Sequence, residues 1–460
     1  MDHYAGIVVA DPSKPVNDEG ALYATLTKST VEGIRKVQGF ENFGKNMSDK
    51  DTWTNVQAIL AHSGSKTTWK NADIKIDVAD DVEMFNFDAM GINNIGGTID
   101  LIGDVTNISV TQNARPGVDV GDLSAVGYSA IDSIADKKSP IVTNFKAAKT
   151  SFDVVNRLEG MDAAGIISAA NMISCPQVNV DGDMDVKVKA AKKGRAIGVY
   201  NIYSDWNLGD NPSIENPGDM AFKKNLTINV EGGSSAFGLS AEIGEVTVDG
   251  NTYVTAKVTD AATDEKEASR PAPGAYGIYV TSNGHLTLKG DETVVTADKA
   301  LYLTKHATII DTDYETETGF EEWVPQTLNS SVSLLSKETT LNGETFTEAG
   351  TTLYVANAVT FNGDADIEGR LIANSDAALK IGEDRTLTLG ASQASGDEVK
   401  KNSFKNLTVA GGTLKNASQI AVDGELYLDG VTVLNESLES GPQAEISADK
   451  IVLGNGTTVI

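Results

Sequence analysis

Ala89-Met90-Gly91-Ile92 is the first of six related tetrapeptides, each consisting of Ala, any residue, Gly and then an apolar or aromatic residue. The other five are Ala125-Val126-Gly127-Tyr128, Ala163-Ala164-Gly165-Ile166, Ala196-Ile197-Gly198-Val199, Ala236-Phe237-Gly238-Leu239 and Ala275-Tyr276-Gly277-Ile278. These Ala-x-Gly motifs recur at intervals of 36, 38, 33, 40 and 39 residues. Recurrence at about 20 to 50 residues is typical of solenoids, propellers and other repeat arrays. Because Ala and Gly let neighbouring backbones approach closely, the pattern favours a solenoid of short strands.

A shorter period appears toward the C-terminus, where Leu387, Leu407 and Leu426 lie in similar apolar–polar alternations. Successive leucines are separated by about 20 residues, at the short end of the range of solenoid repeats. Each of these intervals matches one coil of a parallel β-helix. The upstream intervals of 33 to 40 residues then correspond either to one coil with a loop or to two short coils. The sequence therefore predicts an all-β fold, a parallel β-helix (β-solenoid), over residues 71–460.

Residues 1–70 lack the Ala-x-Gly motif and contain two of the four tryptophans, Trp53 and Trp69. We expect this stretch to form an N-terminal cap, because solenoids need atypical repeats at their exposed ends. A short helix is predicted near residues 30–38. From residue 71 the pattern changes to short alternating strands, for example residues 73–78 and 97–102.

The composition limits the classes of partner. The formal net charge of −28 argues against binding nucleic acid or anionic membrane surfaces, since both would repel the chain. Cys175 is the single cysteine, so no intramolecular disulfide can form. No apolar stretch approaches the ~20 residues of a membrane-spanning helix, so we expect no direct membrane insertion by this segment.

The two ends of the sequence suggest a piece of a longer protein. The start, Met1-Asp2-His3, lacks the charged and apolar regions of a signal peptide. The last nine residues resemble a strand, a turn and a second strand, and an uncovered strand edge is normally avoided. We therefore expect the natural chain to continue beyond residue 460.

Several segments resemble the passenger domains of autotransporter (type V secreted) adhesins, the pertactin and AIDA-like group. The resemblance lies in the Ala-x-Gly motifs, in the Asn406-Leu407-Thr408-Val409 strand and in Gly411-Gly412-Thr413-Leu414. It covers residues 71–460 and is one of general pattern. It implies a right-handed β-helix, export through a C-terminal outer-membrane barrel and display on the bacterial cell surface.

Three stretches interrupt the repeat and are predicted to be loop insertions, near residues 204–225, 260–273 and 311–325. Function in solenoids often lies in such insertions. The third insertion combines carboxylates with aromatic rings, which together can contact a sugar or a protein. Its candidate binding residues are Asp311, Asp313, Tyr314, Glu315, Glu317, Phe320 and Trp323. An ordinary charged loop is an equally good interpretation.

The sequence contains only weak signals for a metal site or a catalytic site. Asp181, Asp183 and Asp185 alternate along one predicted strand, so their side chains would share one face. This face is a weak Ca²⁺ candidate, with a solvated acidic face as the simpler interpretation; no other metal or cofactor is predicted. No Gly-Asp-Ser-Gly sequence of a serine protease occurs, and Gly284-His285 before a strand is typical of a structural or exposed histidine.

These observations together predict a non-enzymatic cell-surface adhesin or self-association passenger. Its partners would be a host surface protein, a glycan or other copies of itself. The alternative is a carbohydrate-active β-helix enzyme resembling phage tailspikes or polysaccharide lyases, because a β-helix alone does not determine function.

Overall fold

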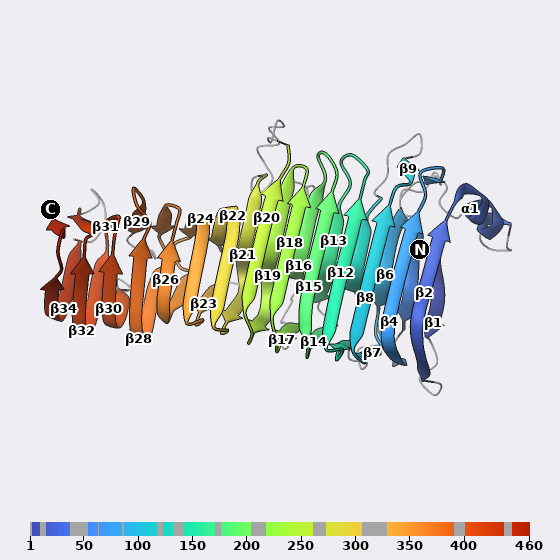
Figure 1. The fold of residues 1–460 in the computed structure, drawn as a ribbon, viewed down its shortest axis with the longest axis horizontal. Coiled ribbons are helices and arrows are strands. Elements are labelled where there is room, and N and C mark those ends of the chain that lie inside the picture. Colours follow the sequence, from blue (N-terminus) through green and yellow to red (C-terminus); the bar gives the residue numbers. More distant parts are fainter. Residues whose placement is uncertain are drawn as a thin grey trace, which may run out of the picture. The chain divides into compact units, whose positions relative to one another are not determined.

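The computed structural model describes residues 2–9, 15–36, 54–62, 64–84, 87–116, 123–131, 141–170, 176–203, 218–260, 273–305, 329–390, 401–436 and 444–460. The chain divides into two compact units: unit 1 is Met1–Ser240 with Ala256–Glu265, and unit 2 is Ala241–Thr255 with Lys266–Ile460. In each unit the strands pair in parallel from one coil to the next (Figure 1). The predicted all-β parallel β-helix is therefore confirmed.

Unit 1 contains three parallel ladders, and most coils contribute one strand to each, although residues 66–78 form a single strand that belongs to two of them. The strands are β1 (Asp2–Val9), β2 (Val16–Leu26), β3 (Thr54–Ala61), β4 (Lys66–Val78), β6 (Phe87–Asn94), β7 (Thr98–Ile102), β8 (Val105–Gln112), β10 (Ala125–Ile131), β11 (Val142–Phe145), β12 (Lys149–Asn156), β13 (Ala163–Ala170), β14 (Gln177–Val180), β15 (Asp183–Ala190), β16 (Arg195–Tyr203), β17 (Asp219–Phe222), β18 (Leu226–Gly232), β19 (Ser235–Val248) and β20 (Thr252–Val258), the last two being shared with unit 2. Two short strands, β5 (Glu83–Met84) and β9 (Arg115–Pro116), form a separate pair. In one coil, β13, β14 and β15 pair in parallel with β10, β11 and β12 before them and with β16, β17 and β18 after them. One coil thus accounts for one Ala-x-Gly interval.

The Ala-x-Gly motifs stack directly on one another. Ala89, Ala125, Ala163 and Ala196 are register partners in successive coils. A Cβ added to Gly165 would lie 2.5 Å from Val186 Cγ1 and 2.6 Å from the Gly198 carbonyl oxygen. Real Cβ atoms do not approach so closely, so the backbones of successive coils can pack this tightly only because glycine occupies each of these stacked positions. We call these glycines the glycine column. Gly91, Gly127 and Gly198 have the same two kinds of contact, at 2.5–2.6 Å.

The three ladders of unit 1 meet in an aromatic core. Tyr128, Phe145 and Phe152, each fully buried, come from β10, β11 and β12. The rings of Tyr128 and Phe145 pack edge to face with centroids 5.6 Å apart, and those of Phe145 and Phe152 are 5.8 Å apart. Tyr128 also donates its hydroxyl to Thr143 Oγ1 at 2.7 Å, so its one polar group is satisfied inside the core. Burial of these rings links the three ladders within a single coil.

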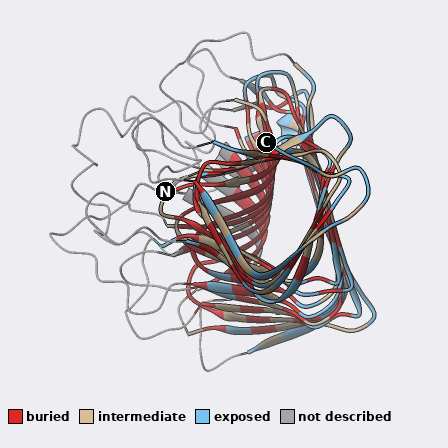
Figure 2. Ribbon diagram, turned by 90° about the vertical axis from the view of Figure 1, so that its left-hand side faces the viewer, coloured by how far each residue is buried: buried red, intermediate tan, exposed pale blue. Residues whose placement is uncertain are grey.

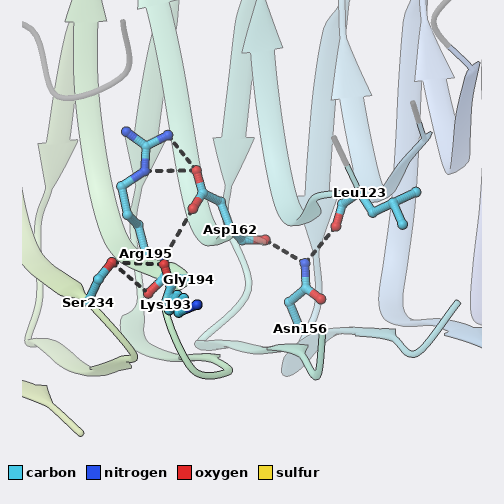
Figure 3. A network of polar contacts seen from close by, with 7 residues as sticks. All are labelled: Leu123, Asn156, Asp162, Lys193, Gly194, Arg195 and Ser234. Atoms are coloured by element: carbon cyan, nitrogen blue, oxygen red, sulfur yellow. Dashed lines mark hydrogen bonds and ion pairs between the residues drawn. The ribbon is translucent and has the colours of Figure 1, made fainter. Parts of the chain in front are cut away.

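Buried and partly buried polar side chains stabilise the corners between strands in unit 1 (Figure 3). The amide nitrogen of Asn156 donates to the carbonyl oxygens of Leu123 and Asp162, at 2.7 and 2.8 Å. Its amide oxygen accepts the Leu158 backbone N–H at 3.1 Å. Arg195 donates through Nε to Asp162 Oδ2 at 2.9 Å, and its backbone N–H reaches Asp162 Oδ1 at 3.0 Å. These bonds satisfy backbone groups that a strand leaves unpaired where it turns.

The parallel ladder begins earlier in the chain than the sequence suggested. β1 pairs in parallel with β3, and β2 pairs with β4 over residues 16–26. The expected cap boundary at residue 70 falls inside β4, because the alternating pattern of residues 73–78 extends back to Lys66. The predicted helix exists as α1 (Lys28–Arg35), a few residues before its expected position. Strand β17 likewise lies within the expected insertion at 204–225, and its pairing with β14 makes residues 219–222 part of the ladder.

Unit 2 combines long strands, several of which bend from one face of a coil to the next, with short strands of two to five residues. They are β21 (Ala275–Leu288), β22 (Glu292–Leu303), β23 (Ser331–Leu334), β24 (Glu338–Thr347), β25 (Thr352–Val355), β26 (Asn357–Phe361), β27 (Ala365–Ile367), β28 (Arg370–Ile381), β29 (Thr386–Leu389), β30 (Asn402–Ala410), β31 (Thr413–Asn416), β32 (Gln419–Asp429), β33 (Thr432–Asn435), β34 (Glu445–Leu453) and β35 (Thr458–Val459). The first part of β28 pairs with β25, and its second part pairs with β26. Buried positions alternate with intermediate and exposed ones along the coil walls (Figure 2).

The leucine period near the C-terminus is only partly what the sequence indicated. Leu407 and Leu426 are register partners in β30 and β32, so the interval between them is one coil. Leu387 belongs to a different ladder, where it pairs with Leu414 of β31. The interval from Leu387 to Leu407 is therefore not a coil, because the two residues lie on different faces of the β-helix.

Candidate functional site

The binding residues predicted from sequence, from Asp311 to Trp323, lie outside the described residues, as does most of each predicted insertion. The site that the structure describes lies on unit 2, in strands before and after residues 306–328. It consists of side chains on the outer side of β21, β22, β24 and β27.

Three aromatic rings form a column at this site. Tyr279, Tyr302 and Phe346 are register partners in β21, β22 and β24. Tyr279 and Tyr302 stack with an interplanar angle of 8° and centroids 6.0 Å apart, and Phe346 follows Tyr302 at 5.1 Å. Tyr279 is buried, whereas Tyr302 and Phe346 point outward, because the residues on either side of each are buried. We call these three residues the aromatic column.

Lys299 lies against the side of this column. Its Nζ is 4.6 Å from the centroid of the Tyr276 ring and 5.2 Å from that of Tyr302, and it donates to the Tyr276 hydroxyl at 2.9 Å. Burial lowers the pKa of Lys299, and the negative charges of Glu344 and Asp298 oppose this shift. A cation over two ring faces is a favourable arrangement, and it becomes stronger where water is partly excluded.

The aromatic column ends at a group of carboxylates. Asp366 of β27 is the register partner of Phe346, and Glu368 lies two residues further along the same face. Partial desolvation raises the pKa of Asp366. Desolvation also raises the pKa of Glu368, and the negative charges of Asp366 and Glu348 add to this effect. The carboxyl groups therefore hold protons more tightly than free ones do.

A histidine and a serine meet on a neighbouring face of unit 2. His285 and Ser331 are register partners in β21 and β23, and His285 Nδ1 lies 2.8 Å from Ser331 Oγ. Burial lowers the pKa of His285, and the negative charge of Glu245 opposes this shift. The sequence identified His285 only as a lone histidine, because its partner lies far along the chain.

The three aspartates of the weak Ca²⁺ candidate are engaged in protein contacts. Asp181 Oδ1 pairs with Lys223 Nζ at 2.7 Å, and Asp185 Oδ2 pairs with Lys149 Nζ at 2.8 Å. Asp183 accepts the backbone N–H of Asn225 at 3.2 Å. Among the residues that the structure describes, no group of three or more His, Cys, Asp or Glu side chains is arranged to hold a metal ion.

No protein-family model matches the chain, and no curated protein and no solved structure is detectably similar to it. The resemblance to autotransporter passengers consequently stays a prediction. In the described part of the chain, no helix is both long enough and apolar enough to cross a membrane.

Proposed function

We propose that the chain is a cell-surface attachment module that holds other cells, a host surface or further copies of itself, and that this attachment involves no catalytic step. The observation that carries this proposal is the aromatic column of unit 2 with its adjoining charges. Aromatic rings provide apolar contact area at low entropic cost, and Lys299 and Asp366 add a donor and an acceptor beside them. Such a combination suits contact with a neutral glycan or with a mixed protein surface.

The repeating scaffold supports the same proposal. Parallel coils fix outward side chains at a spacing of about 4.8 Å, so a column of rings is preorganised before a partner arrives. Preorganised contacts bind more tightly because less entropy is lost on association. Secretion through an outer-membrane barrel and display outside the cell belong to this proposal and rest on the sequence resemblance.

The experiment is an attachment and aggregation assay with cells that display the chain. Replacing Phe346 with Ser should reduce attachment or aggregation about tenfold. The matched control is Asn144→Ser, which alters an outward ladder of unit 1 where Asn144 donates to Asp100 Oδ1 and accepts from Asn179. Equal attachment by the two variants, or none by the unmodified chain, would contradict the proposal.

Self-association has an additional requirement, because two chains of charge −28 repel each other over about one Debye length, ~8 Å at physiological salt. Added salt or millimolar Ca²⁺ should therefore strengthen self-association in light-scattering measurements. A variant with Asp311, Asp313, Glu315 and Glu317 changed to Asn or Gln tests the contribution of the predicted loop. Association that weakens with salt and ignores this variant would exclude the electrostatic explanation.

The second candidate is a carbohydrate-active enzyme. It is favoured by Asp366 and Glu368 beside Phe346, two nearby carboxyl groups with raised pKa values, since a glycosidase acts through a pair of carboxyl groups. Cleavage of any member of a polysaccharide panel by the purified chain, abolished by Asp366→Asn, would replace the attachment proposal with this one.

A further inference from the structure

We propose that His285 and Ser331 form a general-base and nucleophile pair that transfers acyl groups from carboxylic esters to water. This inference goes beyond the attachment function and does not depend on it. The pair lies on β21 and β23, whereas the aromatic column lies on β21, β22 and β24.

The geometry of the pair is set by the parallel ladder. Residues 285–288 of β21 are in register with residues 331–334 of β23, so His285 and Ser331 lie on adjacent strands and point to the same side. The buried neighbours Leu286 and Val332 face the core, which leaves His285 and Ser331 on the outer face. The Nδ1–Oγ distance of 2.8 Å is within the range that proton transfer between a base and its nucleophile requires.

The electrostatic surroundings favour the base form of the imidazole. Burial lowers the pKa of His285 below its ordinary value of 6.5, so the ring is neutral at pH 7 and can accept a proton. Glu245, on the part of β19 that belongs to unit 2, is the charged group that acts on the ring, and its carboxylate favours the protonated form. Through its charge, Glu245 thus favours the imidazolium that forms when Ser331 is deprotonated.

The reaction balances without a cofactor. Ser331 Oγ attacks the ester carbonyl carbon while its proton passes to His285 Nδ1, in the tautomer that carries a proton on Nε2. The carbon–oxygen bond to the leaving alcohol then breaks, and the alcohol takes the proton from Nδ1. Water attacks the acyl-serine with His285 again as base, and the carboxylic acid leaves as Ser331 regains its proton.

The chain offers a matched control on the same strand. Ser333 also faces outward, two residues after Ser331, but its register partners are Thr287 and Tyr354. Because both serines lie on the same face of one strand, a difference in their reactivity measures the effect of His285.

The experiment treats the full chain with a fluorophosphonate probe and locates the adduct by mass spectrometry. We expect Ser331 to be labelled at least tenfold faster than Ser333, and His285→Gln to lower the Ser331 rate at least tenfold. The rate should rise with pH up to the pKa of His285, below 6.5, and then level off. Absence of a Ser331 adduct, or an equal rate in the His285→Gln variant, would overturn the proposal.

A second measurement separates catalysis from a structural role. In a Cys175→Ser background, the Ser331→Cys and Ser333→Cys variants are alkylated with iodoacetamide across pH. We expect the thiol at position 331 to titrate at least one pH unit below the ordinary value of about 8.5, since it can pass its proton to His285 and leave a thiolate beside an imidazolium. Equal thiol pKa values at the two positions would show that the histidine does not activate this site.

Discussion

Unit 1 and the C-terminal part of unit 2 each build a parallel ladder, but from coils of different size. In unit 1 the register partners Asn144 and Asn179 are 35 residues apart in the sequence. In unit 2 the register partners Asn416 and Asn435 are only 19 residues apart. The period of a solenoid is therefore not fixed by its strand pairing, which requires only that each coil return to register.

The difference in period corresponds to a difference in packing. Coils of unit 1 place three separate strands around an aromatic core and bring backbones together at the glycine column. Coils of unit 2 use bent strands such as β28, β30 and β32, with register shifts where each strand bends. We expect the stability of the larger coils to depend on a few specific residues, and the stability of the smaller coils to depend on many equivalent residues.

The largest effect is expected from the aromatic core of unit 1. Phe145→Ala should lower the local free energy of unfolding by about 4 kcal/mol, because it removes a buried ring that contacts Tyr128 and Phe152. The corresponding change in unit 2, Leu414→Ala, should cost about 3 kcal/mol. Hydrogen exchange by mass spectrometry measures both changes, and each should spread only to neighbouring coils. Loss of protection over both units at once would contradict this local dependence.

The glycine column provides the next comparison. Gly165→Ala should destabilise unit 1 by about 3 kcal/mol, because the added Cβ would overlap Val186 and the Gly198 carbonyl. Gly390→Ala in unit 2 should change stability by no more than about 0.5 kcal/mol, since its nearest neighbour, Glu368 Cα, would be 3.3 Å away. Hydrogen exchange measured at increasing denaturant concentration gives the stability change of each of the two variants. Similar losses at both sites would mean that close backbone approach does not distinguish the units.

Hydrogen bonds at the buried corners should contribute more to stability than hydrogen bonds along the exposed ladders. Asn156→Ala should cost about 2 kcal/mol, since it leaves the Leu123 carbonyl, the Asp162 carbonyl and the Leu158 N–H without their partner. Asn342→Ala removes two exposed bonds of unit 2, one accepted from Asn362 and one donated to Thr296 Oγ1, and should cost at most about 0.5 kcal/mol. The same hydrogen-exchange measurement gives both values. A larger loss of stability in Asn342→Ala than in Asn156→Ala would contradict this expectation.

The smallest effect concerns pH. The folded-state pKa of Asp366 is raised from its ordinary value of 3.8, so the folded chain binds this proton more tightly than the unfolded chain does. Stability should therefore fall as pH rises from 3.8 through the raised pKa, and the loss should persist at neutral pH. Asp366→Asn should remove this slope and slightly raise the melting temperature at pH 7. A lower melting temperature in the variant would mean that the carboxylate stabilises the fold.

The sequence was most informative at positions where only one residue type fits the local geometry. The Ala-x-Gly motifs marked the repeat correctly because only glycine tolerates the contacts found at Gly127 and Gly165, although the sequence left open whether one interval was one coil or two. Leu387 was misplaced because leucine fills the core on every face of a coil. The pairing of His285 with Ser331 joins strands on either side of the long segment between β22 and β23. Pairing across such a segment depends on its length and register, which alternation alone does not specify.

The measurement that tests the central claim most directly is the distance between spin labels on register partners. In a Cys175→Ser background, labels replace Asp153 and Lys187 in unit 1, or Thr360 and Lys380 in unit 2. Both pairs should show strong dipolar broadening, because in-register parallel neighbours are about 4.8 Å apart. Control pairs at Asp153 with Asp183 and at Thr360 with Asp376, displaced by four positions along the strand, should show much weaker broadening. Strong broadening in a control pair with weak broadening in its in-register pair would contradict the proposed coil lengths.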